Sequence, residues 1–284
     1  MMSAFARAVH AEVLKLKRTL ALLMTFVAPV LVALLTFFMQ SNQLSHGRGL
    51  KAANLWDTLS LTTLSIWAIF MLPLLITLET ALLAGIEHGE RQWKHLFALP
   101  VSRTSIFAAK YFVTQALALF STLLTCVMVA VSGYALMALF PAAGLHDAGA
   151  PPVAMILGLA MPVWLTAGLL VSIHLWVALR WPSFTVALGA GIAGTFFALF
   201  AASAKIGAYY PWLLPVNAIN AKVPERMAAA YWLGILGGLL VAAAACVDFV
   251  RREESAPAGL SRKGMLAWGA MACAFLVFAI RLQK

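Results

Sequence analysis

The sequence predicts an all-α polytopic membrane protein, and three observations support this fold class. Of its 284 residues, 63% are hydrophobic and 11% are charged, against roughly 25% charged residues in a typical soluble domain. The mean hydropathy of +0.92 leaves too few polar residues to cover the surface of a water-soluble domain. The apolar residues also form long continuous runs, as membrane-spanning helices require and the alternating strands of a β-barrel do not.

Seven apolar segments account for most of the chain: residues 19–39, 57–86, 106–140, 153–179, 184–204, 229–250 and 265–280. A spanning helix needs about 20 apolar residues, so residues 1–250 are predicted to form one transmembrane domain with six spans. Residues 251–284 are expected to form a linker and an extra membrane segment. This seventh segment is short; it either spans the bilayer or lies on the inner surface, and its unbroken hydrophobicity favours spanning.

The basic residues predict a cytoplasmic N-terminus. With that end inside, 13 of the 20 lysines and arginines fall on the inner side and seven on the outer side, in line with the positive-inside rule. Because this positive charge lies at helix ends, it sets the topology and requires no nucleic-acid partner. We therefore expect a multi-pass protein of the inner (cytoplasmic) membrane.

Residues 3–18 have the pattern of an amphipathic helix that precedes the first span. One side carries apolar residues at spacings of three and four: Phe5, Val9, Val13 and Leu16. The other side carries basic residues: Arg7, His10, Lys17 and Arg18. This pattern predicts an elbow helix along the membrane surface; the alternative is a solvated basic tail that only sets the topology.

The inner loop between the second and third segments, residues 87–103, carries the most informative pattern. Trp93, Leu96 and Phe97 share one edge of a short helix that Pro100 ends. Trp and Arg are over-represented at protein-binding hot spots, so the loop is suited to dock a soluble cytosolic partner. The alternative is an interfacial helix in which Trp93 anchors to the headgroups of membrane lipid.

The same loop and its flanks resemble a known family. The order Glu87, Trp93-Lys94, Leu99-Pro100-Val101-Ser102-Arg103 and Lys110, preceded by Glu12 and Leu16-Lys17-Arg18, is similar to that of ABC-2-type ABC transporter permeases, especially the lantibiotic-immunity and bacitracin-export branch. The resemblance implies a six-helix bundle that pairs with a second permease, either a copy or a paralogue. It also implies a coupling helix that binds a cytosolic ATPase subunit through Glu87, Glu90, Arg91, Trp93, Lys94, Leu96, Phe97, Pro100, Ser102 and Arg103.

The sequence contains no G-x-x-x-x-G-K-[ST] motif. The chain is therefore expected not to be an enzyme and to bind no cofactor itself, with ATP and Mg²⁺ held by the partner subunit. The run Gly189–Gly194 does match G-x-G-x-x-G, but it lies inside an apolar segment and predicts close helix packing. The histidines are scattered, which gives no metal site.

Two ionisable residues, Glu79 and His174, lie inside the predicted spans at similar depths from the inner side. A charged side chain at such a depth costs about 2.5–3.5 kcal/mol on insertion scales, so both are expected to face protein or water. One hypothesis pairs them near the inner mouth of a translocation path. The alternative is a protonated Glu79 bonded to a backbone carbonyl, with His174 an unrelated core residue.

The function predicted from these features is the permease subunit of an ATP-driven exporter. The resemblance implies a hydrophobic or amphiphilic substrate such as an antimicrobial peptide or antibiotic, and the short outer loops leave no room for a substrate-capture domain. The alternative is a proton-coupled secondary transporter that uses Glu79 and His174. In the outer segment Tyr209–Pro215, aromatic residues and two prolines predict either a re-entrant cap or an interfacial anchor.

Overall fold

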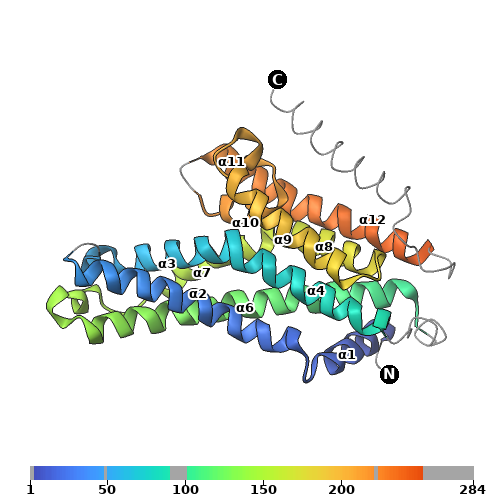
Figure 1. Cartoon of the computed structure of the whole chain (residues 1–284), viewed down its shortest axis with the longest axis horizontal. Helices are drawn as coiled ribbons and strands as arrows, with labels where there is room; N and C mark the ends of the chain where they lie inside the picture. The colour runs from blue at the N-terminus through green and yellow to red at the C-terminus, as the bar shows by residue number, and fades with distance from the viewer. Residues whose placement is uncertain (1–2, 48–49, 90–100, 221–222, 252–284) are drawn as a thin grey trace.

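The computed structural model describes residues 3–47, 50–89, 101–220 and 223–251, which form a bundle of long helices without strands over those ranges (Figure 1). Six helical stretches are long and apolar enough to cross a membrane: Leu20–Ser45, Ala52–His88, Arg103–Leu139, Val153–Arg180, Phe184–Ala201 and Pro224–Arg251. They confirm the first six predicted spans. The predicted seventh segment, 265–280, lies outside the described residues.

The elbow helix α1 (Ala4–Leu16) begins at Ser3, whose side chain accepts a hydrogen bond from the Ala6 amide. Arg18 has a positive φ of 65°, which turns the chain into α2 (Leu20–Ser45). The helix lies where it is predicted, and the basic residues Arg7, His10 and Lys17 are exposed. Leu16 is buried with Val9 packed against its cluster, and Glu12 is buried on the same side because charged partners lie there.

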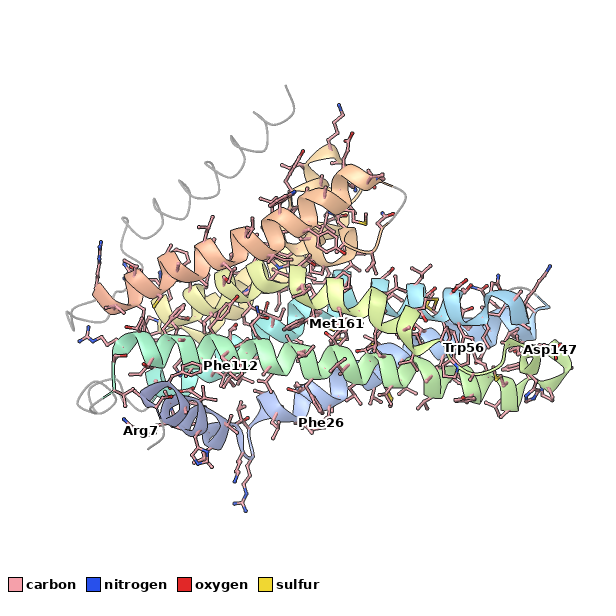
Figure 2. All side chains as sticks on the ribbon, turned by 180° about the vertical axis from the view of Figure 1, so that it is seen from behind. Arg7, Phe26, Trp56, Phe112, Asp147 and Met161 are labelled. Atoms are coloured by element: carbon pink, nitrogen blue, oxygen red, sulfur yellow. The ribbon has the colours of Figure 1, made fainter. Side chains whose placement is uncertain are left out.

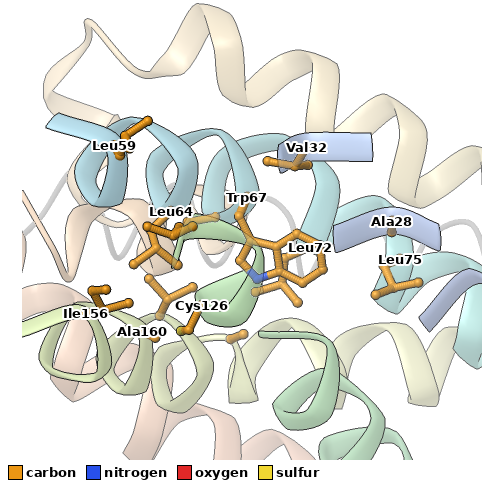
Figure 3. Packing of buried hydrophobic residues seen from close by; sticks show 14 of the residues in the cluster. Ala28, Val32, Leu59, Leu64, Trp67, Leu72, Leu75, Cys126, Ile156 and Ala160 are labelled. Atoms are coloured by element: carbon orange, nitrogen blue, oxygen red, sulfur yellow. The ribbon is translucent and has the colours of Figure 1, made fainter. Parts of the chain in front are cut away.

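The second span consists of α3 (Leu55–Ile66), a single π-helical turn η2 (Trp67–Met71) and α4 (Leu72–Gly89). The third span, α6 (Arg103–Leu139), runs without interruption from its Ser102 cap. Helices α2, α4 and α6 contact one another and form one side of the bundle (Figure 1). At its centre, Trp67 is fully buried among Leu64, Leu72 and Cys126 (Figure 3).

The other side of the bundle is built from the last three spans. The fourth span is broken at Ala167 into α7 (Val153–Thr166) and α8 (Gly168–Arg180), and the fifth is α9 (Phe184–Ala201). The sixth span consists of α11 (Pro224–Tyr231), the π-helical stretch η7 (Trp232–Gly237) and α12 (Gly238–Arg251). Helix α4 packs against α8 and α9, which joins the two sides.

Short helices make the outer connections. Between the third and fourth spans lie η3 (Pro141–Ala143) and η4 (Leu145–Ala148). After the fifth span come η5 (Lys205–Ala208), η6 (Pro211–Leu213) and α10 (Leu214–Asn217), and the side chains from Pro211 to Pro215 are buried. The segment predicted as a cap or an anchor therefore packs into the protein.

Two glycines of α9 allow neighbouring elements to approach its backbone closely. A side chain added at Gly191 would overlap Thr77, and one at Gly194 would overlap Trp212. The glycine-rich run of α9 is thus a helix-packing surface, as predicted from its position in an apolar segment.

Candidate functional site

The candidate site lies where the elbow helix meets the two helices that flank the loop 87–103. Glu87 is in the last turn of α4, and Lys110 lies about two turns into α6. Helix α1 packs across α6 at this end of the bundle, where Figure 2 labels Arg7 and Phe112. Phe5 of α1 makes an edge-on contact with Phe112 of α6, with the ring centroids 6.0 Å apart.

Four charged side chains form a closed ring at this junction, which we call the ion ring (Glu12, Lys15, Glu87 and Lys110). Lys15 Nζ donates to Glu12 Oε1 and to Glu87 Oε1, both at 2.8 Å. Lys110 Nζ donates to Glu12 Oε2 at 2.9 Å and also to Glu87 Oε1. Each lysine therefore bridges both carboxylates, and the ring has no net charge.

The ion ring is removed from solvent almost completely. Lys110 and Glu87 have no exposed surface and Glu12 is 3% exposed, whereas the Lys15 side chain is 23% exposed. Isolated charges cannot be buried this way without losing several kcal/mol each of hydration energy. Mutual neutralisation is what allows the four groups to stay buried, so each depends on the others.

The electrostatics of α1 follow from this pairing. Burial alone would raise the pKa of Glu12, but the nearby Lys110 and Lys15 ammonium groups outweigh burial and hold that pKa below its ordinary value. Burial would likewise lower the pKa of Lys15, but Glu87 and Glu12 outweigh it and raise that pKa. Both groups of α1 are therefore charged at neutral pH.

Local sequence explains how the ring is positioned. Glu12 and Lys15 are three residues apart and lie beside Leu16, which packs with Leu83 and Val113 in a small apolar cluster. Ser102 fixes the start of α6 by accepting a hydrogen bond from the Ser105 amide at 3.1 Å. The cluster and the cap together place the charges of three helices within reach of one another.

The structure describes only part of the predicted partner-binding set. Glu87 points into the ion ring, Ser102 caps α6, and Arg103 Nη1 donates to the Val250 carbonyl at 3.2 Å. The remaining predicted residues lie outside the described part of the chain: Glu90, Arg91, Trp93, Lys94, Leu96, Phe97 and Pro100. Their contact with an ATPase subunit remains a prediction.

The structure gives Glu79 and His174, which one hypothesis pairs, different hydrogen-bond partners. Glu79 Oε1 lies 2.9 Å from the Thr25 hydroxyl, and His174 Nε2 lies 3.3 Å from the Thr77 hydroxyl. No hydrogen bond or ion pair joins the two within the described ranges. Each has a threonine of a neighbouring helix as its partner: Glu79 of α4 contacts Thr25 of α2, and His174 of α8 contacts Thr77 of α4. Their place in a translocation path remains a prediction.

Sequence reasoning missed that Glu12, Lys15 and Lys110 interact. Lys110 lies inside the apolar segment 106–140, and Glu87 directly follows the segment 57–86. A lysine and a glutamate so close to the inner ends of consecutive spans are a signal for a buried pair. The part that Glu12 plays in the ring could not be found this way, because Glu12 is 98 residues from Lys110.

The described residues contain no group of three or more His, Cys, Asp or Glu side chains placed to hold a metal ion. The arrangement at the junction is therefore one of fixed charges that join three helices. Such a site suits the transmission of movement between helices.

Comparison with known proteins identifies the family. No curated protein and no solved structure matches the chain. A family model described as ABC-2 family transporter protein matches residues 8–198, which include the ion ring, the first four spans and most of the elbow helix and of the fifth span. Together with the six apolar helices, this match over more than half of the sequence shows that the chain belongs to the ABC-2 family of transporter proteins.

Proposed function

We propose that this protein is the membrane subunit of an ATP-driven exporter and that the loop 87–103 receives the movement of a separate ATPase subunit. Family membership supports a transport permease and an association with an ABC ATPase. The sequence carries no nucleotide-binding motif of its own. ATP and Mg²⁺ accordingly bind the partner, and the chain converts the partner's movement into transport.

The observation that carries this proposal is the position of the ion ring. Glu87 lies at the start of the loop and Lys110 about two turns beyond its end, and both are bonded to the elbow helix through Lys15 and Glu12. Breaking a buried ion pair leaves an uncompensated charge and costs about 3–5 kcal/mol. Displacement of the loop is therefore expected to move α1, α4 and α6 together as one unit.

The outer connections and the composition of the spans bear on the direction of transport and on the cargo. The connections around 139–153 and 201–224 are short helical turns, which suits export better than the capture of a substrate from outside. A bundle with mainly apolar spans suits a hydrophobic or amphiphilic substrate, such as an antimicrobial peptide or antibiotic. Transport by such a subunit requires a second permease, identical or paralogous, to complete the path.

The first experiment tests partner binding. The full chain is purified from its native membrane in detergent, and the co-purified proteins and ATPase activity are compared between wild type and Trp93→Ala plus Phe97→Ala. We expect a nucleotide-binding subunit with the wild type and its loss from the variant. If the wild type purifies alone without ATPase activity and transports with a pH gradient instead, the proton-coupled alternative replaces the exporter.

A second variant separates binding from transmission. Glu87→Gln plus Lys110→Met removes one charge of each sign, so the remaining Glu12 and Lys15 still neutralise each other. A fluorophore at His10→Cys, on the exposed side of α1, reports movement of the elbow when ATP is added. We expect the variant to keep the ATPase subunit but to lose this ATP-dependent signal. An undiminished signal would show that the ion ring does not transmit movement.

A further inference from the structure

A third buried acid, Glu79, lies outside the ion ring and takes no part in the proposed transmission. It sits in α4, has no exposed surface, and faces Thr25 of α2. Its Oε1 lies 2.9 Å from the Thr25 hydroxyl, and its Oε2 is buried without a hydrogen-bond partner. A carboxyl group with one partner is poorly satisfied if it is charged.

The number of hydrogens available at Thr25 decides whether the charged or the protonated form of Glu79 fits the site. The Thr25 hydroxyl carries one proton but lies 2.9 Å from two oxygens, Glu79 Oε1 and the Ala21 carbonyl oxygen. If Glu79 were a carboxylate, both neighbours would be acceptors, and one contact would have no hydrogen between its oxygens. If Glu79 carries a proton on Oε1, it donates to Thr25, which in turn donates to Ala21, and both contacts are hydrogen bonds.

The same argument applies to Thr77 and His174. The Thr77 hydroxyl lies 2.7 Å from the Pro73 carbonyl oxygen and 3.3 Å from His174 Nε2. The carbonyl can only accept, so the hydroxyl proton goes to Pro73 and His174 Nε2 is the donor to Thr77. With Glu79 protonated, each threonine accepts a hydrogen bond from a buried titratable group and donates its own to a backbone carbonyl.

Within the described part of the chain, no positive charge pairs with Glu79. Among the described residues, no lysine, arginine or histidine forms an ion pair with it, and neither α2 nor α9 contains a titratable side chain. The other helices packed against α4, and α4 itself, contribute the remaining titratable groups: His174 and Arg180; Arg103, Lys110, Tyr111, Cys126 and Tyr134; Glu87 and His88.

We propose that Glu79 is a proton-binding site, a neutral carboxylic acid that fastens α4 to α2 by donating its proton to Thr25. Loss of this proton would leave Glu79 Oε1 facing Thr25 with too few hydrogens to satisfy both contacts. A state in which Glu79 is charged therefore requires water or a cation between α2 and α4. The proton thus holds this part of the bundle closed and dry.

Infrared spectroscopy of the full chain in lipid nanodiscs tests the proposal at neutral pH, where exposed carboxyl groups are ionised. We expect a carbonyl band of a protonated carboxylic acid in the wild type and its loss in Glu79→Gln. The control Glu225→Gln, at an exposed position of α11, should keep the band. The measurement needs neither substrate nor ATPase subunit, so its outcome is independent of the exporter proposal.

Thr25 supplies a second, independent readout if Glu79→Gln fails to fold. Thr25→Val removes the acceptor, and we expect the acid band to move to higher wavenumber, whereas Thr25→Ser should leave it in place. Absence of the band in the wild type, or a band that neither Glu79→Gln nor Thr25→Val alters, would overturn the proposal.

Discussion

Lys110 illustrates how strongly one residue can depend on its partners. Its side chain has no exposed surface and reaches a carboxylate from α1 and another from α4. Removing one member of a buried ion pair is far more costly than removing both, because the charge left behind stays desolvated. The ion ring is therefore best tested by comparing single and double substitutions.

We expect Lys110→Met to lower the free energy of unfolding by about 3–5 kcal/mol. Glu87→Gln plus Lys110→Met should cost less than Lys110→Met alone, because the remaining Glu12 and Lys15 still pair. Unfolding in detergent, followed by tryptophan fluorescence, measures both changes. The matched control Lys17→Met alters an exposed lysine of the elbow and should change stability by less than about 0.5 kcal/mol. Equal losses for Lys17→Met and Lys110→Met would contradict the ring.

The docking of α1 should depend on pH only at the extremes. The pKa of Glu12 is lowered from about 4.5. Its contribution to the stability of the docked helix is therefore complete above that pH and is lost as the pH falls through the lower pKa of the folded state. The pKa of Lys15 is raised from about 10.5, so its contribution is complete below that pH and is lost as the pH rises further. Hydrogen exchange of residues 4–16, corrected for intrinsic rates, should show constant protection between these limits. Loss of protection with a midpoint near pH 6 or 7 would contradict the role of Glu12 and Lys15 in docking α1.

At the scale of elements, the break between α7 and α8 lies against the π-helical stretch η7. A side chain added at Gly234 would overlap the backbone of Thr166, and one at Gly238 would overlap the backbone at Gly168 and Leu169. The Ser172 hydroxyl donates to the Gly238 carbonyl oxygen at 2.8 Å. Two irregular helices thus touch through their backbones.

Gly234→Ala should therefore destabilise the bundle by about 1–3 kcal/mol, because the backbone of the fourth span cannot yield as a flexible side chain would. Gly158→Ala, in α7, is the matched control: no atom lies within 4 Å of the added carbon. Because alanine favours helices over glycine by up to about 1 kcal/mol, that control should be neutral or stabilising. Thermal unfolding of the two variants in the same detergent measures the difference, and a stabilising Gly234→Ala would show that the contact is looser than described.

The helices follow from the sequence more closely than the site does. Runs of apolar residues are a local property, so the first six spans match the predicted segments to within a few residues at most ends. The burial of Glu12 in α1 could not be predicted, because a glutamate indicates solvent exposure unless Lys110 is known to lie opposite. Glu12 and Lys110, which bond to each other in the ring, are 98 residues apart, and only the packed fold brings them together.

On the scale of the whole molecule, six spans place the N-terminus and Arg251 on the same side of the membrane. The distribution of basic residues predicts that this side is the cytoplasm. Reporter fusions after Arg251 should therefore be active only as cytoplasmic reporters, whereas a fusion after Lys284 should report the outer side if 265–280 spans. Two fusions on the same side would place that segment on the inner membrane surface, and an outer reporter active at Arg251 would invert the predicted orientation.

The order of synthesis gives the ion ring one more consequence. Glu12 and Lys15 leave the ribosome first, and Lys110 is added 98 residues after Glu12. Until α6 has been inserted, Glu12 and Glu87 share Lys15 alone, and the incomplete ring carries one net negative charge. The ring can therefore close only after the third span has arrived, so the elbow helix, although it is made first, is fastened to the bundle only after α6 has joined it.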